Sequence, residues 1–333
     1  MRELDLIAAI ERAYDRSTDD AAWLADLATL VGPAFGPGLS PTTAFFFDIH
    51  PDVGKVPRLG EFASAGGAAS TRPQYEKMHS MGTEEDQRRV YECDMFTLLS
   101  RVVGRDPSKE SVHATGMQGD DSLGLRVNVT PYRGVLITTM VPRRYRIPRR
   151  TLWTRFAAHV GAALRLRQEQ APPSEATAAA VLTPGGKLEH GTGGAIAARD
   201  ELGAAVRSID RARGKLRRLD PEAASAHWRA MVQGEWSLVD WLDHDGKRFL
   251  LAQDNRIPTG SPPELTDRER QIVACAAMGH SNKLIAYDLG LSPGTISVVL
   301  ARAAAKLGAS SRPALIRAYR DRIVAPESPG GTR

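Results

Sequence analysis

The most constraining feature of the sequence is a series of helix-start and helix-stop signals within residues 265–316. Thr266 and Glu269 have the spacing of a capping box, in which each side chain binds the backbone N–H of the other residue. Ser281 and Ser292 are placed to cap two further helices. A glycine, which ends a helix at little conformational cost, closes each of the first three helices: Gly279, Gly290 and Gly308. These signals, with apolar residues at helical spacing between them, predict four short helices.

Two of these helices are joined by a tight glycine turn, which is the arrangement of a helix-turn-helix. In that motif the second helix enters the major groove of DNA by its N-terminal half. Here that half offers Ser297, Val298, Ala301 and Arg302. Lys283, at the start of the preceding helix, can reach a phosphate with the help of the free N–H groups there.

The pattern LTDRER…G.SNK.IA..LGLS..TIS..L.....KLG..SR resembles the C-terminal domain of LuxR-type (GerE-like) transcription regulators. The resemblance runs from Leu265 to Arg312 and on to about Tyr319. It implies DNA contacts at nine positions: Asn282, Lys283, Thr295, Ser297, Val298, Ala301, Arg302, Lys306 and Arg312. It also implies binding as a homodimer to a two-fold site, with Leu315, Ala318 and Tyr319 on the fourth helix as candidate interface residues.

Three positions depart from the family pattern. Ser297 stands where a basic residue is usual, Val299 where a His is frequent, and Leu284 where Glu is common. We therefore expect base recognition to depend on a hydroxyl group and on methyl packing against thymine, with few bidentate hydrogen bonds.

The composition is that of a soluble protein that can bury sizeable cores. Of the 333 residues 42% are hydrophobic and 25% are charged, and this length predicts two or three domains. The net charge of +5 suits contact with a polyanion. Two cysteines provide no disulfide framework, and the N-terminus lacks the apolar run of a signal peptide. We expect a cytoplasmic protein with no membrane span.

Residues 1–170 predict a mixed α+β domain: two helices, strands over 42–49 and 58–64, and helices over 73–81 and 84–103. A hairpin of strands 123–130 and 134–141 and a long helix over 148–168 complete it. The order of elements resembles GAF-type sensory domains, which implies a small molecule bound against one face of the sheet. Four aromatic residues are candidates to line such a pocket, although we favour the alternative that they are core: Phe45, Phe47, Tyr91 and Phe96.

Residues 175–256 follow a Pro-Pro linker and predict a hairpin, a long basic helix over 196–219, a helix over 223–232 and a second hairpin. This order is similar to a reduced PAS-like module. The alternative is that the segment has no core of its own and packs onto the first domain. Three tryptophans would then join the two parts: Trp228, Trp236 and Trp241.

We find no pattern that predicts catalysis, and we expect no enzyme activity, cofactor or metal. The eight His have no zinc spacing with Cys or carboxylates, and no Walker loop or Rossmann glycine pattern occurs. The pair Asp120–Asp121 is read as a solvated loop tip, and the arginines between 143 and 150 as a solvated connection rather than a second polyanion contact.

The sequence therefore predicts an α+β sensor-like region followed by an all-α, four-helix LuxR-type helix-turn-helix domain over residues 262–324. The expected function is DNA-binding transcription regulation by a homodimer, with an unidentified small-molecule ligand or protein partner at the N-terminal region. The alternative is a protein-interaction or scaffold module whose helix-turn-helix no longer reads specific DNA.

Overall fold

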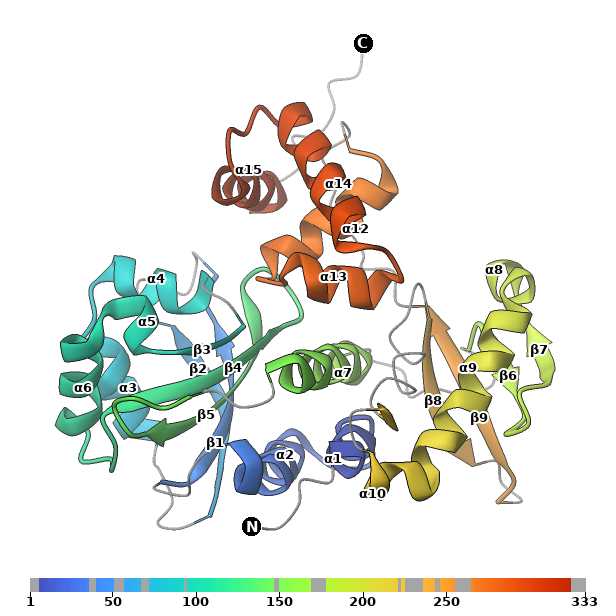
Figure 1. Ribbon diagram of the computed structural model, residues 1–333, viewed down its shortest axis with the longest axis horizontal. Helices are drawn as coiled ribbons and strands as arrows, with labels where there is room; N and C mark the ends of the chain where they lie inside the picture. The colour runs from blue at the N-terminus through green and yellow to red at the C-terminus, as the bar shows by residue number, and fades with distance from the viewer. Residues whose placement is uncertain are drawn as a thin grey trace.

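The computed structural model describes residues 6–35, 40–50, 57–66, 72–92, 95–146, 150–168, 178–220, 223–224, 236–242, 246–254 and 265–324. Two antiparallel sheets stand on either side of one long helix, and the C-terminal helices lie above that helix (Figure 1). The first sheet has five strands in the order β2-β1-β5-β4-β3. Its strands are β1 (Thr42–Asp48), β2 (Arg58–Ala65), β3 (Phe96–Leu98), β4 (Asp121–Asn128) and β5 (Arg133–Val141).

Helices cover both faces of this sheet (Figure 1). One face packs against α2 (Asp20–Phe35) and α7 (Arg150–Gln168), and α1 (Leu6–Ala13) packs against these two helices. The other face is covered by α3 (Arg72–Ser80), α4 (Glu84–Glu92), α5 (Ser100–Val103) and α6 (Arg105–Ala114). Side chains alternate along a strand, so β4 sends Leu123, Leu125 and Val127 into the α7 core and the intervening residues to the opposite face.

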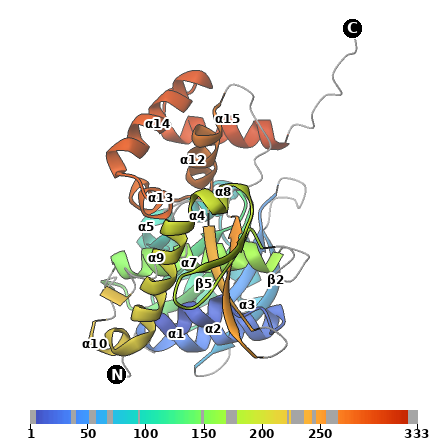
Figure 2. The same cartoon turned by 90° about the vertical axis from the view of Figure 1, so that its right-hand side faces the viewer.

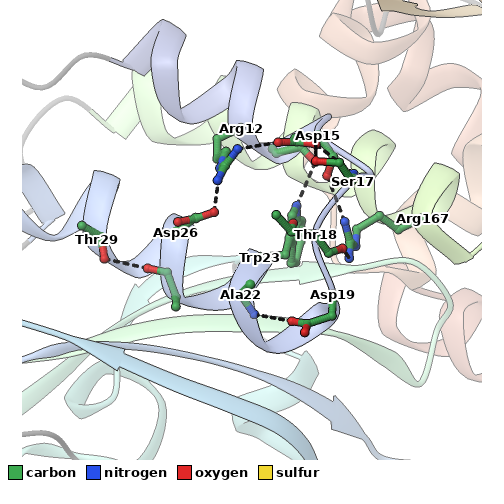
Figure 3. A network of polar contacts seen from close by, with 12 residues as sticks. Arg12, Asp15, Ser17, Thr18, Asp19, Ala22, Trp23, Asp26, Thr29 and Arg167 are labelled. Carbon is green, nitrogen blue, oxygen red and sulfur yellow. Dashed lines mark hydrogen bonds and ion pairs between the residues drawn. The ribbon is translucent and has the colours of Figure 1, made fainter. Parts of the chain in front are cut away.

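A polar network fixes the connection between α1 and α2 to the end of α7, as Figure 3 shows. Arg167 donates to the backbone oxygens of Asp15 (2.9 Å) and Thr18 (2.6 Å), and its guanidinium lies 5.3 Å from the ring centre of Trp23. The residue that caps α2 is Asp19, whose carboxylate accepts from Ala22 N–H at 2.8 Å. The hydroxyl of Ser17, two residues before Asp19, donates to Asp15.

The second sheet has four strands in the order β7-β6-β9-β8. They are β6 (Ala180–Leu182), β7 (Leu188–Gly191), β8 (Trp236–Leu242) and β9 (Arg248–Asp254), with α8 (Gly193–Ala197), α9 (Arg199–Arg211) and α10 (Arg217–Leu219) between the hairpins. Both predicted hairpins are therefore present. The hydrophobic core of the first domain continues into this segment through Leu182, Val206, Leu238 and Leu250. The segment thus packs onto the first domain, with Trp236 in the shared core. Trp241 does not join the two parts, because it packs against Phe249 in a small apolar cluster of the segment itself.

Two predicted elements differ in the structure, and α2 extends across a Gly-Pro pair. The helix expected over 84–103 is α4, then strand β3, then α5, because residues 96–98 pair with β4. The helix expected over 196–219 is interrupted, and Gly214 is non-helical (φ −76°, ψ −151°). The second helix runs through Gly32 and Pro33 to Phe35, which is buried against Phe96 and Trp153.

The four aromatic residues proposed for a ligand pocket are core side chains. Phe45, Phe47, Tyr91 and Phe96 are each at most 2% exposed, and they pack against other rings. Several predicted features lie wholly or mostly outside the described residues: Trp228, the helix expected over 223–232, and the Pro-Pro linker before residue 175. No single helix in the described part of the chain is long and apolar enough to cross a membrane, although one bent pair, 282–289 with 293–306, passes that test jointly.

Candidate nucleic-acid interface

The C-terminal domain consists of the four helices that the sequence predicts: α12 (Asp267–Ala277), α13 (Asn282–Leu289), α14 (Pro293–Lys306) and α15 (Arg312–Val324). Its core is separate from that of the N-terminal region. The residues at its centre come from all four helices: Ile272, Val273, Ile285, Ile296, Leu300, Leu315 and Tyr319. Because it has its own core, the position of α14 is set within this domain.

Each predicted helix start is capped as expected. The capping box joins Thr266 and Glu269 in both directions, with Thr266 N–H donating to Glu269 Oε2 at 2.8 Å. Ser281 and Ser292 accept from the backbone N–H groups that begin α13 and α14. Gly290 takes a left-handed conformation (φ +66°), which lets the chain turn by 107° between these helices. Because of this turn, α14 runs away from α13 and its outer face stays uncovered.

The outer face of α14 is exposed along its N-terminal half, where the sequence predicted base contacts. Ser297, Ala301 and Arg302 are exposed, and Val298 is 50% exposed. A half-exposed valine in a polar surface loses contact with water if it packs against another apolar group, such as the methyl group of thymine. Arg302 and Lys283 make no ion pair with any described residue. The outer face of α14 and the start of α13 therefore offer one exposed apolar side chain, Val298, and two cations, Arg302 and Lys283.

A hydrogen-bond network links α13, α14 and the start of α15. Arg312 donates to Asn282 Oδ1 and to the backbone oxygen of His280, both at 2.5 Å. Asn282 donates in turn to Ser297 Oγ at 2.8 Å, and that hydroxyl donates to Pro293 O at 3.1 Å. From the sequence, Asn282, Ser297 and Arg312 are predicted as three separate DNA contacts. The structure brings them together, and the Ser297 hydroxyl, expected to read a base, already has a donor and an acceptor within the domain.

Two further predicted DNA contacts have partners inside the domain. Thr295 Oγ1 lies 2.9 Å from the Oγ of Ser292, at the cap of α14. Lys306 Nζ lies 2.7 Å from Glu269 Oε2, so this lysine joins the end of α14 to the capping box of α12. Of the nine positions, Lys283, Val298, Ala301 and Arg302 are the ones whose side chains remain directed to solvent with no such bond.

The Glu269–Lys306 contact makes the stability of this domain depend on pH. The hydrogen bond from Lys306 is the main cause that holds the pKa of Glu269 below its ordinary value of 4.5. A carboxylate with a lowered folded-state pKa stabilises the fold above its unfolded pKa, and this contribution disappears as the pH falls through the folded pKa. We expect Glu269→Gln to reduce the free energy of unfolding by about 0.5–1 kcal/mol at pH 7 and to have a progressively smaller effect as the pH falls through the folded-state pKa of Glu269.

Chemical denaturation of the two proteins between pH 3 and pH 7 measures this difference. Glu189→Gln is the matched control, because Glu189 also pairs with a lysine (Lys187, 3.1 Å) but on an exposed surface. A stability difference for Glu269→Gln that is the same at both ends of the pH range would contradict the role of its charge.

The side of α13 opposite the domain core packs against the N-terminal region. Leu284 is fully buried and belongs to the core of α7 and the two sheets, not to the core of its own domain. Tyr287 packs beside it, with the guanidinium of Arg155 on α7 at 5.8 Å from the ring centre. Arg320 on α15 lies 5.8 Å from the ring of Tyr132, in the turn between β4 and β5. Figure 2 shows the four helices above the N-terminal elements.

The candidate dimer residues need correction. Leu315 and Tyr319 are each 1% exposed, because both side chains face α12 and α14 within the domain core. These two residues are therefore not available to a second copy of the chain, whereas Ala318 is half-buried. The helical periodicity identified an apolar stripe correctly, but that stripe is the inner face of α15.

The paired carboxylates also differ from expectation. Asp121 is 1% exposed and accepts from Ser100 N–H (2.9 Å) and Ser108 Oγ (2.8 Å), so it joins β4 to α5 and α6. Asp120, by contrast, is partly exposed near His113. Within the described residues no group of three or more His, Cys, Asp or Glu side chains is placed to hold a metal ion.

Comparison with known proteins agrees with this geometry. Residues 263–319 match the family of bacterial regulatory proteins of the luxR family. A transcriptional regulatory protein FixJ from Azorhizobium caulinodans is 49% identical over 53 residues, and one from Rhizobium meliloti is 47% identical over 53 residues. Each match covers 16% of this chain and about a quarter of the relative, 25% and 26% respectively. No solved structure matches the chain. The C-terminal domain is thus a LuxR-type helix-turn-helix domain.

Proposed function

We propose that this chain is a transcription regulator that binds double-stranded DNA by inserting the N-terminal half of α14 into the major groove. The observation that carries the proposal is the exposed α14 face with Val298 and Arg302, in a domain that matches the luxR family. Lys283, which is exposed at the N-terminus of α13, is proposed to bind an adjacent phosphate. In this proposal the chain is not an enzyme, and it acts in the cytoplasm.

The N-terminal region, residues 6–254, is proposed to control this binding. The support is physical contact: Leu284 of α13 is buried in the core that α7 shares with both sheets. A change in that core alters the free energy of the arrangement in which α13 packs on α7. Such a change shifts the population of this docked arrangement relative to one in which the DNA-binding domain is released. The five-stranded sheet with helices on both faces supports the proposal of a GAF-like sensor, and the second sheet is proposed as an extension of it.

We propose further that the regulator binds DNA as a homodimer. Two-fold symmetric DNA sites are bound by two-fold symmetric proteins, since each copy places one recognition helix in one half-site. The exposed side of α15 is the proposed contact, since Leu315 and Tyr319 are enclosed by the domain core.

Lys283→Ala is expected to weaken binding by a similar factor on every DNA sequence, because a phosphate contact carries no base information. The slope of log K against log salt concentration should fall by about 0.9, the value for one phosphate on double-stranded DNA. Fluorescence anisotropy titrations on two unrelated duplexes at several salt concentrations measure both effects. Lys187→Ala, which removes one positive charge from the second sheet, should leave both the slope and the affinity unchanged. A sequence-dependent loss would assign Lys283 to base contact instead.

A second candidate is a protein-interaction module whose helix-turn-helix does not read specific DNA. It is favoured by the internal hydrogen bonds of Ser297 and the ion pair of Lys306, which reduce the groups free to contact DNA. Selection of duplexes from a random library by the full-length protein, at two salt concentrations, separates the candidates. An enriched motif supports the regulator. Binding without enrichment, or no binding at either salt concentration, supports the interaction module.

A further inference from the structure

We propose that the cavity between the first sheet and helices α3–α6 binds a small organic acid with an apolar body and one carboxylate. The cavity has a volume of about 170 Å³ and is partly open to solvent. This is close to the roughly 150 Å³ of a cavity that holds one benzene ring, so it can accept a single-ring or short-chain acid. This binding site is independent of the DNA-binding proposal.

The floor of the cavity is formed by alternate residues of two neighbouring strands. Ser122, Gly124 and Arg126 of β4 project to the face opposite α7, beside Leu136 and Thr138 of β5. Gly124 has no side chain, and a Cβ there would lie only 3.3 Å from Leu136 Cδ1. The open space on this face therefore depends on glycine at this position.

The walls are mainly aliphatic and thioether groups from four surrounding segments: Met78, Val90, Met95, Leu99, Val102 and Val103. Methionine side chains adapt their shape to a ligand because they are unbranched and flexible. An apolar body entering this space leaves water and contacts these groups, which is the main source of affinity in small-molecule sites.

The polar groups define the other end of the ligand. Arg126 is a charged lining side chain that is only 3% exposed. Of the two lining carboxylates, Glu110 is exposed, and Asp86 is half-buried and accepts hydrogen bonds from Thr83. The hydroxyls of Ser122 and Thr138 lie 2.8 Å apart on the same floor. A guanidinium recognises a carboxylate through two parallel N–H···O bonds, and hydroxyls supply further donors. A buried cation at the floor also disfavours ligands that carry a positive charge.

Strand β4 lies between the cavity and α7, the helix against which the DNA-binding domain packs. Residues of β4 that alternate with the floor residues pack against α7, and a Cβ at Gly161 of α7 would lie 3.2 Å from Val127 Cγ1. Helix α7 in turn contacts α13. An effect of the acid on DNA affinity would follow this route, and that part of the inference rests on the proposed function.

The test uses full-length protein with benzoate, phenylacetate and hexanoate, each paired with its neutral amide. Isothermal titration calorimetry should show at least one acid binding, with its amide bound at least tenfold more weakly. Gly124→Val, which fills the floor, and Arg126→Lys, which keeps the charge but loses the planar fork, should each weaken that acid at least tenfold. Gly185→Val is the control, because a Cβ at Gly185 meets only Thr183 Oγ1 within 4 Å.

A readout on the unaltered protein guards against variants that fail to fold. In methyl NMR spectra the acid should shift the methionine signals of the cavity lining, Met78, Met81 and Met95, and leave Met278 in the DNA-binding domain unchanged. Absence of binding by every acid, equal binding of acid and amide, or shifts confined to other methionines would overturn the site. Acid binding without any change in DNA affinity would leave the site intact and remove only its regulatory effect.

Discussion

A Val298→Glu variant is expected to bind its selected DNA site at least about a hundredfold more weakly than the unaltered protein, a loss of about 2.7 kcal/mol. Val298 is half exposed on the N-terminal part of α14. A carboxylate there loses the apolar contact with a base and brings a negative charge to a groove bordered by phosphates. The fold should not change, because the side chain is outside the core of the domain.

Ile196→Glu is the matched control for this variant. Ile196 on α8 is also 50% exposed, so the substitution makes the same change in charge on a similarly exposed apolar residue of another part of the chain. Anisotropy titrations give the affinities, and thermal melting confirms that both variants are folded. Wild-type affinity for a folded Val298→Glu protein would show that α14 does not enter the groove.

The second large effect is expected from Leu284→Glu, which should release the DNA-binding domain from the N-terminal region. Burying a leucine stabilises an arrangement by about 1.5–3 kcal/mol, so the equilibrium between docked and released forms should shift by roughly tenfold or more. If docking prevents the DNA-binding domains of two copies from reaching adjacent half-sites, their release by Leu284→Glu raises the DNA affinity. The increase should be no larger than the shift in the docking equilibrium. The domain itself should remain folded, because Leu284 is absent from its own core.

Small-angle scattering should show a larger radius of gyration for Leu284→Glu, and anisotropy titrations should show the tighter DNA binding. Leu219→Glu is the control, since Leu219 is 80% exposed and undergoes the same chemical change without loss of a buried contact. A larger radius with unchanged DNA affinity would mean that docking does not regulate binding. An unchanged radius would mean that Leu284 does not hold the two parts together.

The features that the sequence predicted best are those encoded locally. The capping box of Thr266 and Glu269 and the left-handed Gly290 are set by residues three or four positions apart, and the four helices follow from them. Strand β3 was missed because its three residues become a strand only by pairing with β4. The role of Asp121 was missed for a similar reason, since its partners Ser100 and Ser108 come from helices that only the folded chain brings near.

Within the candidate interface, the sequence predicted that the outer residues of α14 share one exposed face, but it did not predict the hydrogen bonds that side chains there make. Arg312 lies 30 residues from Asn282 in the chain, so their hydrogen bond has no local signal. Leu284 did give a signal, as an apolar residue where the family commonly has Glu. The structure supplies its reason, which is burial against a part of the chain far away in sequence.

Helix α7 lies between the two sheets and beneath α13, and its residues Trp153, Phe156, Val160 and Leu164 are buried in one continuous core. Exchange of genetic segments between proteins preserves a fold only where the cut leaves each core intact. The DNA-binding domain keeps its own core when it is cut away, and the cut exposes only the patch around Leu284, which packs in the core of the N-terminal region. Residues 6–254 do not divide in this way, so a recombination point between the two sheets would leave both halves with exposed apolar surface. We therefore expect residues 6–254 to be inherited as a single module, while the DNA-binding domain can be exchanged among unrelated partners.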